Sequence, residues 1–128
     1  MEEFLHGELT YRINGLIFEM YKELGFGYQE KYYQRAFEEI LKINKIKYKK
    51  ELHCPISFRD KIIGRYFVDF LVDNKIVVEF KIGNEMYQRH FKQVIGYLKI
   101  NNLQIGLLAL ITPEKITIKR IINSNNFS

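Results

Sequence analysis

The chain has 128 residues, 47% of them hydrophobic and 15% aromatic, which fits one compact domain and excludes a largely disordered segment. Twenty Lys and Arg against 15 Asp and Glu give a formal charge of +5, which favours polyanionic partners, although an ordinary lysine-rich surface has the same balance. The single cysteine excludes an internal disulfide and a cysteine-based zinc site, and no apolar stretch could span a bilayer, so we expect a cytoplasmic protein.

The first third of the chain predicts two helices. Apolar residues recur at helical spacing from Glu8 to Leu24, and a second amphipathic stretch runs from about Gln29 to Lys42. The sequence "GFG" at 25–27 separates them, because glycine accepts the left-handed conformation that ends helices.

Three strands follow, and they predict an antiparallel meander. Residues 46–58, 62–72 and 76–81 are rich in β-branched and aromatic side chains. The turns between them, at 59–61 and 73–75, are short enough to pair each strand with the next.

The last third of the chain predicts one helix and two more strands. We expect a helix over 83–100, a strand buried on both faces over 103–111, and an alternating edge strand over 115–122. Residues 1–122 are then expected to form a single domain, and 123–128 a short flexible tail.

Charged residues interrupt two of the apolar strands. Asp69 lies within "YFVDFLV", and Glu79 and Lys81 close "KIVVEFK", where side chains two apart share a face. If the loop holds an odd number of residues, such as 73–75, Asp69 lies opposite Glu79. With a strict two-residue loop it lies opposite Val78.

Two interpretations fit this group of charges. Facing carboxylates repel each other, and Mg²⁺ is a natural compensation that also acidifies a bound water, so the group could hydrolyse phosphodiesters. Alternatively, the charges form a cross-strand ion pair with a spare acid at a sheet edge. The apolar residues on both faces around Asp69 and Glu79 favour the first interpretation.

Asp69, Glu79 and Lys81, spaced as D-x9-E-x-K, resemble the signature of the PD-(D/E)XK nucleases, although Val68 replaces its proline. More specifically, "GYQEKYY" resembles the pattern that names the GxxExxY family within that superfamily. The runs "RYFVDFLVDNKIVVEFK", "HFKQVIGYLK" and "IGLLAL" follow in the order that this family shows. The resemblance covers the chain from about Leu16 to Leu110.

The resemblance implies an α/β fold with a restriction-endonuclease-like core of order αβββαβ. In this core a mixed sheet is flanked by helices, here with an extra N-terminal helix and a C-terminal edge strand. The implied activity is that of a Mg²⁺- or Mn²⁺-dependent nuclease that hydrolyses the phosphodiester bonds of nucleic acid with a metal-activated water, and we expect DNA rather than RNA as the nucleic acid. A nucleic-acid-binding or regulatory module that keeps the fold without significant cleavage is the alternative, and a homodimer or a protein partner could supply specificity to either.

The resemblance also implies roles for particular residues. The metal would be held by Asp69, Glu79 and the backbone carbonyl of Phe80, and Glu30 could be a further metal ligand. Lys81 would orient the water, and Glu30 and Gln93 would support the site. Glu30 could instead be a surface acid that complements the dipole of its helix, and Gln93 could satisfy a buried backbone group.

Aromatic residues alternate with basic ones at the predicted helix starts, a pattern that can stack nucleobases and hold phosphates. The candidates for nucleic-acid contact are Tyr33, Arg35, Arg89, Lys92 and Tyr97. Tyrosines packed beneath a basic rim are the alternative for each of them, and for Tyr97 in particular a place in the core.

Overall fold

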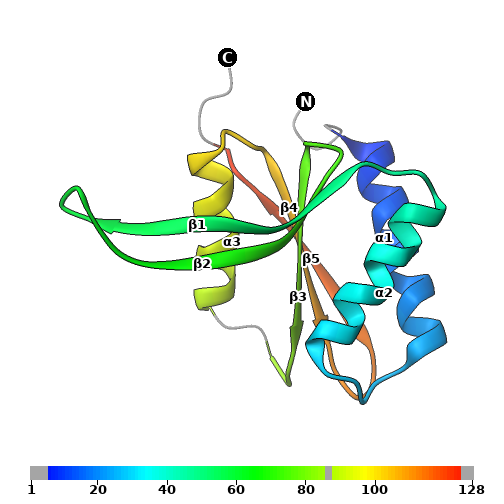
Figure 1. Ribbon diagram of the computed structural model, residues 1–128. Coiled ribbons are helices and arrows are strands. Elements are labelled where there is room, and N and C mark those ends of the chain that lie inside the picture. Colours follow the sequence, from blue (N-terminus) through cyan, green and yellow to red (C-terminus); the bar gives the residue numbers. More distant parts are fainter. Residues whose placement is uncertain (1–5, 86–87, 125–128) are drawn as a thin grey trace.

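The computed structural model describes residues 6–85 and 88–124, which fold into three helices and one five-stranded sheet (Figure 1). The elements are α1 (Gly7–Leu24), α2 (Glu30–Ile43), β1 (Tyr48–Phe58), β2 (Lys61–Val72), β3 (Ile76–Ile82), α3 (Gln88–Ile100), β4 (Ile105–Ile111) and β5 (Ile116–Ile122). This is the predicted order of helices and strands. Residues 86–87, including Tyr87 at the expected start of the third helix, lie outside the described part of the chain.

The sheet is mixed and its strands are ordered as in the sequence. Strand β3 pairs with β4 in parallel, and the other neighbouring strands pair antiparallel. The parallel pair follows from α3, because strands of the same direction need a crossover connection. The predicted α/β fold class, with a mixed sheet flanked by helices, is confirmed.

Helices cover both faces of the sheet, so the sheet is the middle layer (Figure 1). Helices α1 and α2 bury Ile17 and Phe37 against one face, together with Phe70 and Phe80. Helix α3 buries Leu98 against the other face. Strand β4 is buried at every position, which explains its uninterrupted apolar sequence "IGLLALI".

Strands β1 and β2 extend well beyond the rest of the sheet. They pair with each other from Tyr48↔Val72 to Phe58↔Lys61, whereas β2 pairs with β3 only from Val72↔Ile76 to Phe70↔Val78. Residues 52–68 therefore form a two-stranded projection, here called the arm, which Figure 1 shows extending away from α1 and α2 and across α3. The place where β2 leaves β3, at Asp69 and Glu79, is called the fork.

The ordered fold reaches further than the sequence suggested. Asn123, expected to begin a flexible tail, is only 3% exposed. Its backbone N–H donates to the carbonyl of Gln104, and its side-chain amide donates to that of Leu103. Residues 125–128 lie outside the described part. Among the described helices, none is long and apolar enough to cross a membrane.

Candidate active site

The turn between β2 and β3 sets the register at the fork. Asp73 and Asn74 are both left-handed, with φ of 53° and 56°, and the Lys75 N–H donates to the Val72 carbonyl at 3.0 Å. Pairing nevertheless starts at Val72↔Ile76, so the loop has the three residues 73–75. Counting back from Phe70↔Val78, the next two residues to face each other are Asp69 and Glu79.

At the fork, the two carboxylates replace the backbone ladder. The Asp69 N–H donates to Glu79 Oε1 at 2.8 Å, and the Phe80 N–H donates to Asp69 Oδ2 at 2.8 Å. Each acid therefore binds the backbone of the opposite strand just where the strands separate. These reciprocal bonds hold the two side chains, here called the acid pair, beside each other.

A twist in β2 makes this exchange possible. Val68 belongs to the core beneath α3, yet Phe70, two residues later, belongs to the core beneath α1 and α2. Residues two apart on a regular strand share a face, so β2 must turn over at Asp69. On β1, the pairing passes over Glu51, whose φ is 55°. The irregularity leaves the Asp69 N–H to be bound by the Glu79 carboxylate.

Two further residues complete the group of charges. The Lys81 ammonium lies 3.5 Å from Glu79 Oε2, and the two side chains are 24% and 3% exposed. Glu30 is the first residue of α2, and its charge acts on both members of the acid pair. Among the described residues, Lys81 is the one cation whose charge acts on the acid pair, and it faces three acids: Asp69, Glu79 and Glu30.

Burial makes the charged forms of these acids unfavourable. Burial and then the charge of Glu79 raise the pKa of Asp69 to about 8. Burial also raises the pKa of Glu79, against the opposing effect of Lys81, and raises the pKa of Glu30. With both members of the pair and Glu30 ionised, three negative charges face one positive charge, which leaves two uncompensated.

A family model described as the PD-(D/E)XK nuclease superfamily matches residues 7–121. The chain belongs to the PD-(D/E)XK nuclease superfamily. The crystal structure of SSO0001 is similar over 89% of this chain and 67% of that chain, with a TM-score of 0.53 and 23% sequence identity, a likeness that shows the fold. No curated protein matches the chain. The more specific resemblance to the GxxExxY family stays a prediction.

PD-(D/E)XK nucleases typically use divalent metal ions such as Mg²⁺, and the donor set at the fork suits one. Two uncompensated negative charges match a dication. No three His, Cys, Asp or Glu side chains of the described residues gather into a closed metal site. Mg²⁺ does not need one, because it is usually held by one or two carboxylates with waters and substrate phosphate. The Phe80 carbonyl, on the same strand edge as its N–H, also points toward the fork.

One polar residue of this PD-(D/E)XK site was missed by the sequence interpretation. The Gln34 amide donates to Asp69 Oδ1 at 3.0 Å, whereas the Phe80 N–H donates to Asp69 Oδ2, so each oxygen of this carboxylate accepts one hydrogen bond. The sequence did contain a clue to Gln34: it lies four residues after Glu30, a spacing that places both side chains on one face of α2.

Gln93 is placed differently from the other predicted site residues. It lines a pocket of about 360 Å³ between the arm and α3, with Cys54 and Tyr66, and its backbone carbonyl accepts a hydrogen bond from the Tyr66 hydroxyl. Over residues 6–85 and 88–124, no hydrogen bond joins the Gln93 side chain to either acid.

Two of the predicted nucleic-acid contacts need correction. Tyr33 is fully buried and its hydroxyl donates to the Gly25 carbonyl at 2.5 Å, and Tyr97 is only 4% exposed. Both rings therefore belong to the core. A buried ring has no face to offer to a base, so neither tyrosine can stack on nucleic acid. Arg35, Arg89 and Lys92 are exposed.

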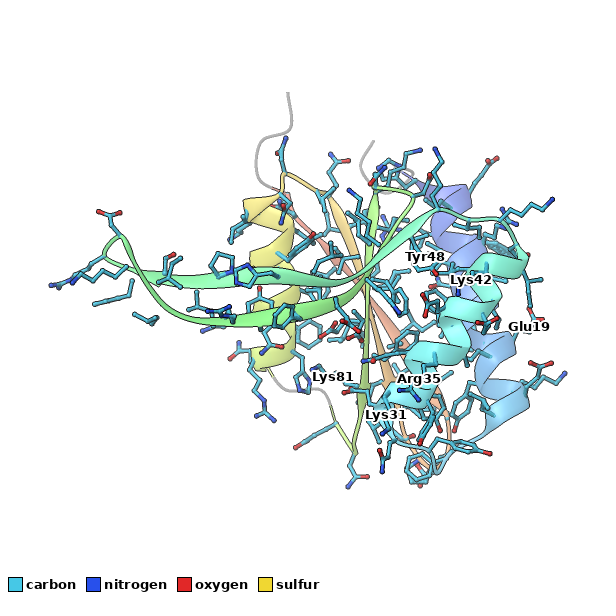
Figure 2. The ribbon with its side chains drawn as sticks, viewed as in Figure 1. Glu19, Lys31, Arg35, Lys42, Tyr48 and Lys81 are labelled. Carbon is cyan, nitrogen blue, oxygen red and sulfur yellow. The ribbon has the colours of Figure 1, made fainter. Side chains whose placement is uncertain are left out.

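The exposed cations of α2 lie close to the acid pair. Lys31 and Arg35 line a pocket of about 220 Å³ together with Lys50 and Asp69. Both also lie over the exposed ring of Tyr32, with the Lys31 ammonium 5.2 Å and the Arg35 guanidinium 5.5 Å from its centroid. In Figure 2, Lys31, Arg35 and Lys81 all lie on the same side of the arm.

Proposed function

We propose that this PD-(D/E)XK domain is a Mg²⁺-dependent nuclease that hydrolyses phosphodiester bonds, with DNA rather than RNA as its main substrate. The observation that carries the proposal is the acid pair, held by reciprocal 2.8 Å hydrogen bonds with the Lys81 ammonium 3.5 Å from Glu79. A solvated charge cluster would not need a buried Glu79 carboxylate beside a partly buried Asp69.

In this proposal each residue of the fork has a separate task. Asp69, Glu79 and the Phe80 carbonyl would hold the ion, with Glu30 adding negative charge. A bound divalent ion acidifies a water and offsets the charge that develops on the phosphate. Lys81 would orient the attacking water, for which its partly exposed ammonium is well placed.

The nucleic-acid surface would extend from the fork over the start of α2. Lys31 and Arg35 line the pocket beside Asp69 and can neutralise backbone phosphates, whereas Lys50 is paired there with Glu38 at 3.1 Å. The domain would be a single unit, since the described helices and strands all pack on one sheet. The lone buried Cys54 suits a reducing compartment such as the cytoplasm, where we propose that the enzyme acts.

The test is a cleavage assay on purified protein. Linear, circular and single-stranded DNA, and RNA, are incubated with Mg²⁺ or Mn²⁺ and the wild-type chain, Asp69→Asn or Lys81→Met. The same hairpin supplies matched controls, because Lys75 and Asp73 form an exposed pair that is also 3.5 Å apart. Asp73→Asn and Lys75→Met therefore make the same chemical changes away from the fork.

We expect both fork variants to lose cleavage by roughly 100-fold or more, and both controls to retain it. Cutting that persists in Asp69→Asn and Lys81→Met would refute the proposed site. Binding without cutting, with every metal and substrate, would instead support a nucleic-acid-binding or regulatory module.

A further inference from the structure

We propose that His53 and Phe67, on the open face of the arm, form a platform on which an unpaired nucleobase stacks, so that the enzyme acts on single-stranded segments of nucleic acid. This inference rests on the proposed nuclease function, because it concerns the substrate of the same acid pair.

The two rings lie on the face of the arm that α3 does not cover. Tyr66 and Val68 pack in the core beneath α3, so Phe67 between them points to the other face. His53 is its cross-strand partner, and the two ring centroids are 5.7 Å apart with an interplanar angle of 57°. Phe67 is 52% exposed, and His53 is also exposed.

The platform leads directly to the acid pair. Phe67 precedes Asp69 by two residues on β2, which is about 7 Å along a strand. The pocket lined by Lys31, Arg35 and Lys50 lies at the inner end of this path. A base stacked on Phe67 would therefore hold a phosphate of the same strand within a nucleotide of Asp69.

Charge on the arm favours nucleic acid over a second copy of this chain. Residues 52–68 carry three cations, Arg59, Lys61 and Arg65, against one acid, Asp60. Arg65 lies two residues before Phe67, on the same strand face, and is exposed. A second copy would bring the same excess of positive charge to this face, whereas a phosphate backbone complements it.

The exposed ring faces select unpaired bases. In a duplex, each base is stacked between its neighbours and offers only its edges, so a ring on the protein surface has no base face to contact. Bases of a single strand offer both faces, and aromatic side chains bind them with little regard to sequence. The implied substrates are single strands, flaps and frayed ends.

The experiment measures binding in EDTA, where cleavage does not interfere. A labelled single-stranded oligonucleotide and its blunt duplex are titrated with wild type, Phe67→Leu, Phe67→Trp and Phe58→Leu, and affinity is read from fluorescence anisotropy. Leucine retains apolar bulk on the arm but has no ring. Phe58, at the far end of the arm and 59% exposed, is the matched control. A 2-aminopurine base in the single strand reports stacking by its quenching.

We expect Phe67→Leu to weaken single-strand binding by roughly 5- to 100-fold, to leave duplex binding unchanged, and to abolish the quenching. Phe67→Trp and Phe58→Leu should bind the single strand as wild type does. Equal losses for single strand and duplex, or no loss, would overturn the platform. The platform would also be overturned if wild type sediments as a dimer and Phe67→Leu as a monomer, because this face of the arm would then be an interface between two copies. Absence of cleavage with any metal would refute the nuclease function but not these binding results.

Discussion

Replacing Asp69 with asparagine is expected to stabilise the metal-free fold at pH 8 and to change it little near pH 4. Burial and the charge of Glu79 raise the pKa of Asp69 to about 8, whereas its ordinary value is 3.8. Between these two values, the folded chain retains a proton that the unfolded chain has released. The free energy of unfolding therefore falls as the pH rises from about 4 to 8, and asparagine removes that fall.

The structure limits the size of this effect. A pKa of about 8 in place of 3.8 lowers the free energy of unfolding at pH 8 by no more than about 6 kcal/mol. Asparagine keeps one oxygen, which can accept the 2.8 Å hydrogen bond from the Phe80 N–H. Its amide nitrogen then faces Gln34, whose side chain must turn to present its own oxygen, and this cost lowers the gain. We expect the variant to gain roughly 2 to 4 kcal/mol, or about 6 to 15 °C in melting temperature.

The assay is thermal unfolding by circular dichroism from pH 4 to pH 9 in EDTA, with Asp73→Asn as the control for an exposed acid of the same hairpin. The difference in melting temperature between wild type and Asp69→Asn should grow with pH. A difference that stays constant from pH 5 to pH 8 would refute the reasoning. Adding 10 mM Mg²⁺ should stabilise wild type at pH 8, by about 1.4 kcal/mol for a millimolar Kd, and Asp69→Asn less. Equal stabilisation of both would mean that Asp69 does not hold the ion.

Three further substitutions probe other parts of the structure. Gln34→Leu removes the amide that binds Asp69, and cleavage at limiting Mg²⁺ should fall roughly 10- to 100-fold, with partial recovery at high Mg²⁺. Tyr33→Phe removes the buried hydrogen bond of the Tyr33 hydroxyl and should lower the free energy of unfolding by about 1 kcal/mol in chemical denaturation. Oligonucleotide affinity should stay unchanged, and a large loss of affinity would show that Tyr33 contacts nucleic acid after all. Gly106→Ala would place its Cβ 2.5 Å from a methyl group of Val94 and should lower the free energy of unfolding by roughly 1 to 3 kcal/mol, whereas an unchanged melting temperature would show that α3 can shift.

Periodicity was sufficient to predict the order of the elements, because each one buries a face of its own. The apolar residues of α1 recur at helical spacing, and β4 is apolar throughout because helices cover both of its faces. The tail was harder to place. Asn123 looks like a loop residue in sequence, and only its hydrogen bonds to the loop before β4 show that it belongs to the fold.

The acid pair could be predicted only as one of two registers. Asp73 and Asn74 suit a two-residue turn, and the Lys75 N–H does close that turn onto Val72. Lys75 is nevertheless accommodated as an extra residue, which brings Asp69 rather than Val68 beside Glu79. The turning over of β2 at Asp69 depends on packing against both cores, and simple alternation along the strand cannot reveal it.

The fork joins the arm to the acid pair mechanically. Because the β2–β3 ladder ends at Phe70, the bonds from Asp69 N–H to Glu79 and from Phe80 N–H to Asp69 tie the base of the arm to β3, while α3 holds the arm further out. Any tilt of the arm must lengthen or shorten them. We therefore expect a molecule that tilts the arm away from β3 to lengthen these two bonds and to move the two carboxylates apart.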